Sequence, residues 1–212
     1  MHQQIQIKTL VVGKLQTNCY LITDFASSET IVLDPGDDAD YITQIIEENK
    51  LKPVIIIATH GHFDHILASW HLQKVYHIPF AISPNDEFLV KDMKKSAQFF
   101  LNKKIMDLPP EINMSLNDQQ LIKIGSCNLE IITTPGHTPG GISLYDKVNH
   151  KIFVGDTVFA GGGVGRTDFK YCDEDKLWQS IKSIMSKPPK TEIFSGHGKL
   201  TSIEKEALIF KL

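Results

Sequence analysis

Hydrophobic and polar positions along the chain form two successive passes of strands followed by helices. In the first pass, the helical segment 39–49 is recognised by Ile42, Ile45 and Ile46, which share one face. Turn residues at Asp34-Pro35-Gly36 separate it from three consecutive antiparallel strands. The elements predicted for this pass are strands 5–12, 18–23, 30–33, 54–58 and 80–82 and helices 39–49 and 66–76.

The second pass repeats this order after residues 84–118, where the hydrophobic pattern gives the weakest prediction of secondary structure. This segment contains a predicted helix near 87–95 and a loop at Pro109-Pro110. The elements that follow are strands 120–124, 129–133, 142–145, 151–154 and 192–195 and helices 173–185 and 201–211. The repeated order predicts an α/β protein in which two sheets pack together with helices on the outside.

Composition is that of a soluble globular protein. The chain has 212 residues, of which 42% are hydrophobic and 22% are charged, enough for one domain with a sizeable core. Its longest strand-like apolar run, 54–58, is far too short to cross a membrane, and the first residues do not resemble a secretory signal. Three scattered cysteines, Cys19, Cys127 and Cys172, argue against a disulfide framework and favour a reducing cytoplasm.

Charge gives no sign of a nucleic-acid or membrane partner. The net charge is −3, and lysine and arginine do not gather into a basic surface. A small molecule is therefore the expected substrate, and the sequence leaves the oligomeric state open.

The chemistry begins at His60-Gly61-His62-Phe63-Asp64-His65, directly after the apolar run 54–58. Three imidazoles and a carboxylate at one strand end are ligands for first-row transition metals, and their crowding favours two ions over one. Packing alone does not explain such a cluster.

Three more polar residues follow short apolar strands and are flanked by glycine, which lets the backbone turn sharply beside a ligand. They are His137, Asp156 and His197. With the first cluster they make five imidazoles and two carboxylates, too many for one tetrahedral site and suited to two sites sharing a bridging carboxylate and solvent. The remaining histidines are expected at the surface or in ordinary packing; they are His2, His71, His77 and His150.

These motifs resemble the metallo-β-lactamase superfamily and, within it, the compact glyoxalase II-like (hydroxyacylglutathione hydrolase-like) hydrolases. The resemblance runs through the segments 17–20, 32–36, 59–65, 134–140, 155–159, 165–169 and 195–198. It implies an αββα sandwich of two mixed sheets with helices on the outer faces. The expected unit is one hydrolase domain, 1–212, without the C-terminal helical substrate domain of larger glyoxalase II enzymes, because only 15 residues follow His197.

The resemblance also implies the ligand set. His60, His62 and His137 are expected to hold one metal ion, Asp64, His65 and His197 the other, and Asp156 to bridge them. Asp34 has no place among these ligands and is expected to orient a ligand histidine or to fix its loop.

Two dications about 3.5–4 Å apart lower the pKa of a bridging water to near neutrality. The expected mechanism is attack of that hydroxide on a carbonyl carbon while one metal stabilises the oxyanion. Asp64 and Asp156 are the expected catalytic carboxylates, and Asp64 could also steer the water. Zinc is the default metal; the histidine and carboxylate donors suit iron and manganese as well.

The leading substrate is an anionic thioester, an S-acylglutathione-like compound, as the resemblance implies. Arg166 lies near the basic residue that contacts the glutathione carboxylate in those enzymes, and a guanidinium suits a carboxylate. An ion pair of Arg166 with Asp168 or Asp173 is an equally good interpretation. The aromatic residue expected two positions after the basic one is Asp168 here, which weakens the glutathione assignment.

Other reactions remain open. A mononuclear-iron persulfide dioxygenase is the main alternative because that family shares the segment 165–169, and hydrolysis of another ester or a lactone is a further one. The glycine-flanked His197 favours the binuclear hydrolases. A β-lactamase and a tRNA-processing nuclease are disfavoured, since neither an export signal nor a basic arm is visible.

Overall fold

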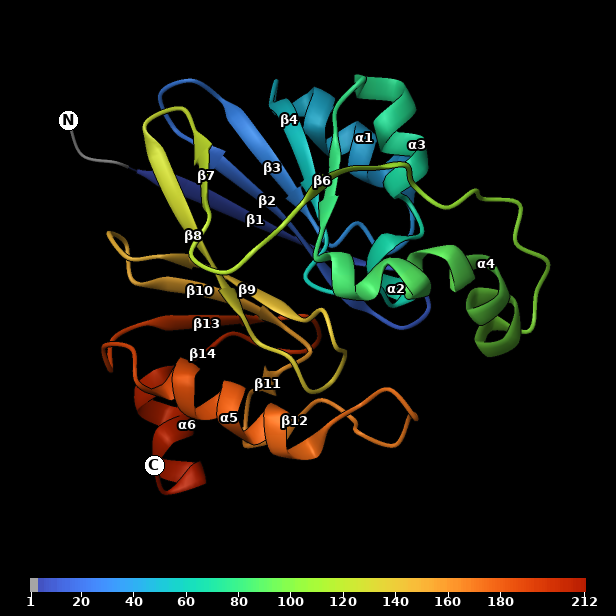
Figure 1. Cartoon of the computed structure of the whole chain (residues 1–212). Helices are drawn as coiled ribbons and strands as arrows, with labels where there is room; N and C mark the ends of the chain where they lie inside the picture. The colour runs from blue at the N-terminus through green and yellow to red at the C-terminus, as the bar shows by residue number, and fades with distance from the viewer. Residues whose placement is uncertain (1–3) are drawn as a thin grey trace.

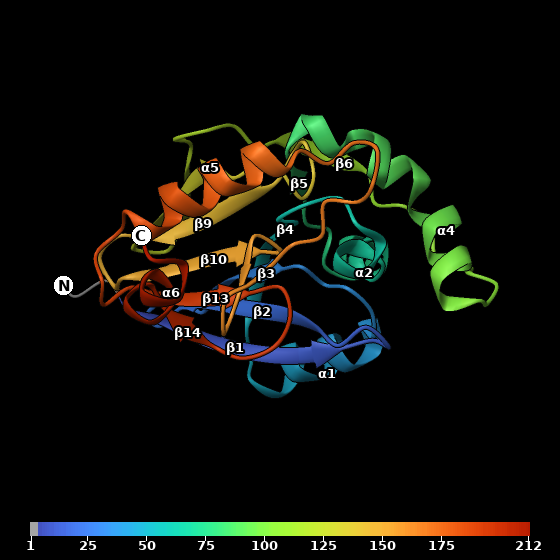
Figure 2. The ribbon, with the colours of Figure 1, turned by 90° about the horizontal axis from the view of Figure 1, so that it is seen from below.

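The computed structural model describes residues 4–212 and arranges them as two sheets packed face to face (Figure 1). Helices cover the outer face of each sheet, so that the layers follow the order α, β, β, α (Figure 2). The predicted αββα sandwich is therefore confirmed. Within the part of the chain that the structure describes, no helix is both long and apolar enough to cross a bilayer.

The first sheet has the strand order β1-β2-β3-β4-β5-β6. Strands β1, β2 and β3 pair antiparallel, as predicted, and β3 to β6 pair parallel. The strands are β1 (Ile5–Val12), β2 (Thr17–Asp24), β3 (Glu29–Leu33), β4 (Lys52–Ile57), β5 (Phe80–Ile82) and β6 (Ile112–Ser115). Its helices are α1 (Ala39–Glu48), α2 (Phe63–Ile66), α3 (Ser69–Tyr76) and α4 (Glu87–Leu101), with one 3-10 turn at Pro84–Asp86.

The second sheet has the order β14-β13-β10-β9-β8-β7, in which only β10 and β13 pair parallel. Its strands are β7 (Leu121–Ile124), β8 (Cys127–Thr133), β9 (Ile142–Asp146), β10 (Lys151–Gly155), β13 (Glu192–Ser195) and β14 (Thr201–Ser202). Helices α5 (Glu174–Met185) and α6 (Ile203–Phe210) cover it. A small hairpin, β11 (Val158–Phe159) and β12 (Gly163–Val164), lies beside it.

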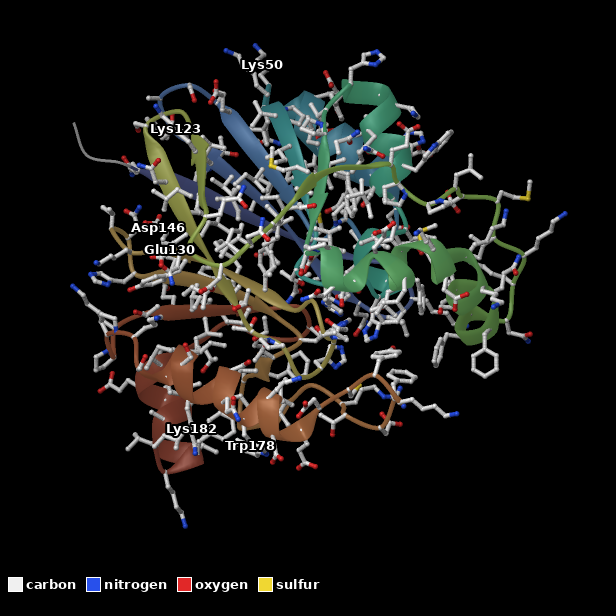
Figure 3. All side chains as sticks on the ribbon, in the orientation of Figure 1. Lys50, Lys123, Glu130, Asp146, Trp178 and Lys182 are labelled. Carbon is white, nitrogen blue, oxygen red and sulfur yellow. The ribbon has the colours of Figure 1, made fainter. Side chains whose placement is uncertain are left out.

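The apolar core explains why the sheets stack. Side chains alternate along a strand, so Ile31 and Leu33 face the second sheet while Val32 faces the helices. Strand β2 is buried over its whole length because both of its faces are covered. Charged side chains such as Lys50 and Lys182 lie at opposite outer ends of the molecule (Figure 3).

Three details differ from the sequence-based prediction. The helix predicted over 66–76 is interrupted, and α2 and α3 are separate because the Ala68 N–H donates to the carbonyl of Pro35. Helix α4 extends beyond 87–95 to Leu101. Strand β6, the β11–β12 hairpin and β14 were not predicted; the residues of β14 fall within the predicted helix 201–211, which begins at Ile203 in the structure. Most of β6 is exposed and lacks the alternation that marks a half-buried strand.

Candidate metal centre

The seven predicted ligand residues meet at one edge of the paired sheets. His60 and His62 follow β4, and Asp64 and His65 lie in the short helix α2. The second sheet contributes the other three from the loops after β8, β10 and β13; they are His137, Asp156 and His197. Because the carboxyl ends of these strands share one edge, residues far apart in sequence converge there.

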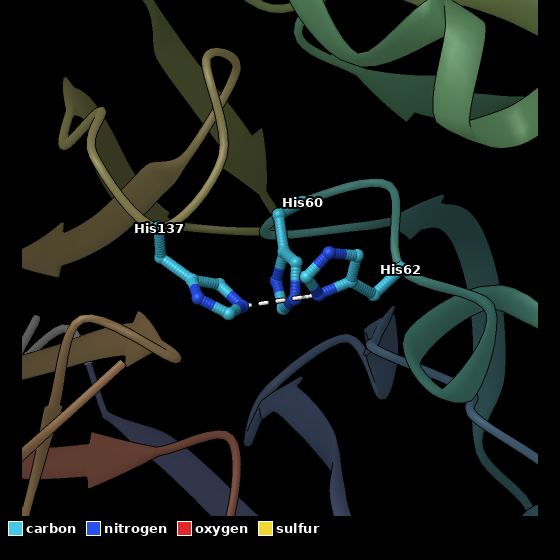
Figure 4. Close-up of side chains that lie close together, drawn as sticks. All are labelled: His60, His62 and His137. Atoms are coloured by element: carbon cyan, nitrogen blue, oxygen red, sulfur yellow. Dashed lines mark hydrogen bonds between the residues drawn. The ribbon is translucent and has the colours of Figure 1, made fainter. Parts of the chain in front are cut away.

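Three imidazoles form the first group. Nδ1 of His62 lies 3.1 Å from Nε2 of His60 and 3.0 Å from Nε2 of His137. Figure 4 shows the three rings turned toward a common point. Three converging ring nitrogens leave one position open, which is the donor pattern of a catalytic metal site.

The second group contains Asp64, His65 and His197. Oδ2 of Asp64 lies 3.8 Å from Nε2 of His65 and 3.4 Å from Nε2 of His197. These atoms could hold a second metal ion.

Asp156 lies between the two groups. Its Oδ1 is 3.5 Å from Nε2 of His65, and its Oδ2 is 3.7 Å from Nε2 of His137 and 3.6 Å from Nε2 of His197. One carboxylate thus reaches members of both groups, as a bridging ligand must.

The donor set fits metal ions. Nε2 of His65 and Oδ1 of Asp156 are buried and have no hydrogen-bond partner among the described residues. Burying such groups unpaired is costly, and a cation between them would satisfy both. Three carboxylates, those of Asp34, Asp64 and Asp156, also surround the buried His65 and create a negative electrostatic potential that favours a cation.

Every histidine of the centre has its outer ring nitrogen held by a partner. This fixes the ring and leaves the inner nitrogen for a metal. The contacts are His60 Nδ1 to Thr59 Oγ1 at 3.0 Å, His62 Nε2 to Tyr171 Oη at 2.9 Å, His65 Nδ1 to Asp34 Oδ2 at 3.0 Å, His137 Nδ1 to the carbonyl of Arg166 at 2.8 Å and His197 Nδ1 to the carbonyl of Gln16 at 3.3 Å.

Electrostatics support this assignment for the first group and for Asp156. Burial lowers the pKa of His60 far below its ordinary value, and burial with the neighbouring His137 lowers the pKa of His62 to about 3. These imidazoles are therefore neutral, the form that binds metal. Burial alone would raise the pKa of Asp156, but His65 beside it lowers the pKa well below its usual range, so this carboxylate is ionised. Around His65, three carboxylates outweigh burial and raise the pKa of the imidazole, which would therefore lose a proton when a metal binds.

Asp34 makes both contacts that were considered for it. Its Oδ2 accepts from Nδ1 of His65, while Oδ1 accepts from the backbone N–H of Thr59 at 2.7 Å. The Thr59 hydroxyl also donates to Oδ2, at 2.7 Å. Asp34 therefore orients a predicted ligand and fixes the start of the loop that carries His60 and His62.

Asp86 was missed by the sequence analysis. This buried carboxylate accepts hydrogen bonds from the N–H of Gly61 at 2.9 Å, the hydroxyl of Thr138 at 2.7 Å and the N–H of Gly140 at 2.6 Å. It joins the loop of His60 and His62 to the loop of His137. Burial raises its pKa, which the three donors partly offset.

The His197 loop is held by the opposite sheet. The Asn18 N–H donates to the carbonyl of Gly196 at 2.7 Å, and its side-chain amide donates to the carbonyls of Ser195 and Gly198, both at 3.0 Å. Gly196 is required here because a Cβ would overlap the Asp156 carboxylate and the His65 ring.

A pocket of about 630 Å³ adjoins the centre and contains His62, His137 and Arg166 in its lining. We call this cavity the aromatic pocket, because its apolar wall contains five aromatic residues: Phe63, Phe88, Phe100, Phe169 and Tyr171. The sequence analysis did not identify this wall, since its residues come from α2, α4 and the loop before α5.

Arg166 forms the ion pair that was one of its two interpretations. Nε and one terminal nitrogen donate to the two carboxylate oxygens of Asp168 at 2.6 and 2.5 Å. The guanidinium also lies 4.4 Å above the ring of Phe169. Among the cysteines, Cys19 and Cys127 are buried as expected, whereas Cys172 is half-buried and donates its thiol hydrogen to the carbonyl of His137 at 3.0 Å. Of the other histidines, His2 lies outside the described residues.

Comparison with known proteins agrees with this geometry. The metallo-beta-lactamase superfamily model matches residues 12–197. Hydroxyacylglutathione hydrolase GloC of Haemophilus influenzae is 33% identical over 204 residues, which cover 95% of each chain.

Three solved structures are also similar. The B3 metallo-beta-lactamase BLEG-1 has a TM-score of 0.87 at 29% identity, covering 95% of this chain and 96% of its own. TTHA1623 in a di-iron-bound form has a TM-score of 0.85 at 30% identity, covering 94% and 96%. ETHE1 from Myxococcus xanthus has a TM-score of 0.77 at 25% identity, covering 95% and 81%. The shared fold, the matched sequence model and the cluster of metal-binding histidines and aspartates together place this chain in the metallo-β-lactamase superfamily.

Proposed function

We propose that the protein is a binuclear metal-dependent hydrolase that cleaves the thioester of an S-acylglutathione-like substrate. The observation that carries this proposal is the pair of ligand groups, His60, His62 and His137 on one side and Asp64, His65 and His197 on the other. Asp156 would bridge them, as its distances to both groups allow. Zinc is the default metal, and the similarity to TTHA1623 in its di-iron-bound form supports iron as the alternative.

The site residues have two roles: some would bind the metal ions, and others orient the binding residues. When bound, the two metal ions supply a hydroxide nucleophile at neutral pH and stabilise negative charge on the carbonyl oxygen. Asp64 and Asp156 would help to hold these ions, and Asp64 could also orient the attacking water. Asp34 and Tyr171 fix the rings of His65 and His62 from outside.

A thioester suits this site because its leaving group needs little help. A free thiol has a pKa of about 8.5, so a thiolate leaves without a strong general acid. An amide nitrogen would need a proton donor beside it. The Tyr171 hydroxyl lines the pocket, but burial raises its pKa and makes it a weak acid for that task. The similarity to GloC, whose name states hydroxyacylglutathione hydrolase activity, supports the same choice.

A persulfide dioxygenase is the second candidate, supported by the likeness to ETHE1 and by the segment Gly165–Phe169. Against it stands the complete second group, in which His197 and Asp64 approach within 3.4 Å. A hydrolase of another ester or a lactone would use the same centre.

Metal quantitation on the purified protein, paired with hydrolysis of S-lactoylglutathione and S-acetylglutathione, tests the proposal. We expect two metal ions per chain, thiol release and no oxygen uptake on glutathione persulfide. The matched variant His197→Ala should keep one ion and lose most activity. One ion in the unmodified protein together with oxygen uptake would favour the dioxygenase. Two ions with no cleavage of any thioester would retain the centre and move the substrate elsewhere.

A further inference from the structure

The aromatic pocket beside the metal centre has a continuous apolar wall. Tyr171 stacks on Phe169 with ring centroids 5.3 Å apart, and Phe88 meets Tyr171 edge to face at 5.5 Å. Phe63 and Phe100 stack at 5.8 Å, and Phe100 approaches Phe169 at 6.4 Å. Phe88 and Phe100 are 44% and 46% exposed, so a large part of this aromatic surface is available to a ligand.

The wall begins at a metal ligand. The Tyr171 hydroxyl lies 2.9 Å from Nε2 of His62, and the ring of Phe169 lies 5.8 Å from that imidazole. A carbonyl group placed beside His62 for attack would therefore direct one of its two substituents against Phe169 and Tyr171.

The charges in the pocket lining indicate whether the acyl chain or the thiol half of the substrate lies against this wall. Apart from the residues of the metal centre, the lining of the pocket carries two charged groups, Asp92 and Arg166, and Arg166 already faces Asp168. A glutathione half carries two carboxylates and an ammonium group, which lose hydration when they enter an aromatic pocket. Asp92 offers those carboxylates no partner, and it is itself paired with Lys95 at 3.2 Å. The thiol half therefore belongs outside, toward the exposed Arg166, and the acyl half belongs inside.

We propose that the aromatic pocket binds an apolar acyl group, such as a medium-length alkyl or an aryl-alkyl chain, and that Phe100 and Phe88 determine this preference. The inference rests on the proposed thioester hydrolysis and specifies its substrate class. In the reaction, water adds to the carbonyl carbon, the carbon–sulfur bond breaks, and the products are an apolar carboxylate, a thiol and a proton. The cavity of about 630 Å³ is lined by Asp64, Asp156 and Arg166 as well as by the aromatic residues, and it lies in the range of pockets that hold drug-sized ligands. It therefore has room for an acyl group larger than lactoyl beside the reacting carbonyl.

The first test compares four thioesters of one thiol on the metal-loaded protein: S-acetyl-, S-lactoyl-, S-hexanoyl- and S-phenylacetylglutathione. We expect kcat/KM for the hexanoyl and phenylacetyl compounds to exceed that for the acetyl and lactoyl compounds by at least about tenfold, since each buried methylene is worth roughly a factor of four. Phe100→Ala and Phe88→Ala should each reduce the hexanoyl-to-acetyl ratio, by about tenfold. Phe99→Ala is the control for lost packing around Phe100: Phe99 is 79% exposed, does not line the pocket and meets the Phe100 ring edge to face at 5.1 Å.

The second test measures binding without turnover. Hexanoate and acetate are titrated calorimetrically into the metal-loaded protein, the Phe100→Ala variant and the Phe99→Ala variant. Tighter binding of hexanoate than of acetate, lost in Phe100→Ala and kept in Phe99→Ala, is the expected result.

The outcomes separate the two proposals. Efficient cleavage of all four thioesters with no dependence on the acyl chain would overturn the pocket assignment and leave thioester hydrolysis standing. A failure to cleave any thioester, with hexanoate still bound through Phe100, would overturn thioester hydrolysis and retain the apolar ligand class. Equal behaviour of Phe100→Ala and Phe99→Ala would also overturn the pocket assignment.

Discussion

Asp34 accepts a hydrogen bond from Nδ1 of His65 at 3.0 Å, and both side chains are almost wholly buried. In a metal-bound centre this contact would select the tautomer with the proton on Nδ1, which leaves the Nε2 lone pair of His65 for the metal. Asp34 therefore acts on the metal centre through a residue that is itself a proposed ligand.

Replacing Asp34 by asparagine should weaken metal binding at the group of Asp64, His65 and His197. The amide would present N–H groups either to the His65 N–H or to the Thr59 donors, so at least one contact is lost. We expect about a 10- to 100-fold loss of affinity for one of two ions. Competition with a chelator, followed by metal quantitation, measures it. Equal loss of both ions would mean that Asp34 supports the loop as a whole.

Asp86→Asn should loosen the group of His60, His62 and His137. Asparagine keeps the shape but offers one acceptor oxygen to the three donors from Gly61, Thr138 and Gly140. Leaving a buried donor unpaired costs about 1–3 kcal/mol. We therefore expect a lower free energy of unfolding and about tenfold weaker binding of one ion, measured by urea unfolding and chelator competition.

Glu87→Gln is the control for this variant. Glu87 is the next residue, but its carboxylate is half exposed and pairs with Lys91 on the surface of α4. An unchanged metal affinity in Asp86→Asn would show that the two loops are held without the carboxylate.

Arg166 and Asp168 form a pair whose variants should have opposite effects. Arg166→Ala is expected to raise KM for an anionic thioester and to leave kcat nearly unchanged, because the guanidinium is exposed and pairs with Asp168, while the contact of Arg166 with His137 is made by its backbone carbonyl. Asp168→Ala frees the guanidinium and should lower KM. Steady-state kinetics of both variants decide the matter: an unchanged KM in Arg166→Ala would make the arginine structural.

Asp24 links the two sheets far from the metal centre, and its contribution should depend on pH. It accepts from Ser27 at the end of β2 and from Ser126 and Cys127 at the turn between β7 and β8. Burial alone would raise its pKa, but these donors lower it below the ordinary value. Asp24→Asn should cost about 2 kcal/mol of unfolding free energy at pH 7.

Because the pKa of Asp24 is lowered in the folded state, its stabilising contribution is complete above the unfolded value of about 4 and is lost as the pH falls further. The difference between the unmodified protein and Asp24→Asn should therefore shrink below pH 4. Urea unfolding at several pH values measures this difference. A difference that stays constant with pH would assign the effect to packing.

The order of the elements and the seven proposed ligands were predictable because their signals are local. His137, Asp156 and His197 each follow an apolar strand and stand beside glycine, and the segment 60–65 is dense in ligand types. Asp86 carries no such signal. It follows Ser83-Pro84-Asn85 at the start of α4 and reads like an ordinary helix-start residue, while its three donors come from loops that only the tertiary fold brings near.

The aromatic pocket was hidden for the same reason. Phe88 and Tyr171 belong to segments separated by many residues, and nothing in their spacing indicates that their rings touch. Strand β6 was missed because its hydrogen-bonding partner β5 lies beyond the whole of α4 and its own residues are largely exposed.

The distribution of the ligands between the two sheets ties assembly of the fold to the acquisition of metal. His60 and His62 precede the second sheet in the chain, whereas His137 belongs to it, and the same division separates Asp64 and His65 from His197. Neither half alone presents a complete set for either ion. Each ion that binds would therefore clamp the two halves together and add its binding free energy to their docking. A chain with one half misfolded would bind neither ion tightly, so metal occupancy serves as a report on the integrity of the whole molecule.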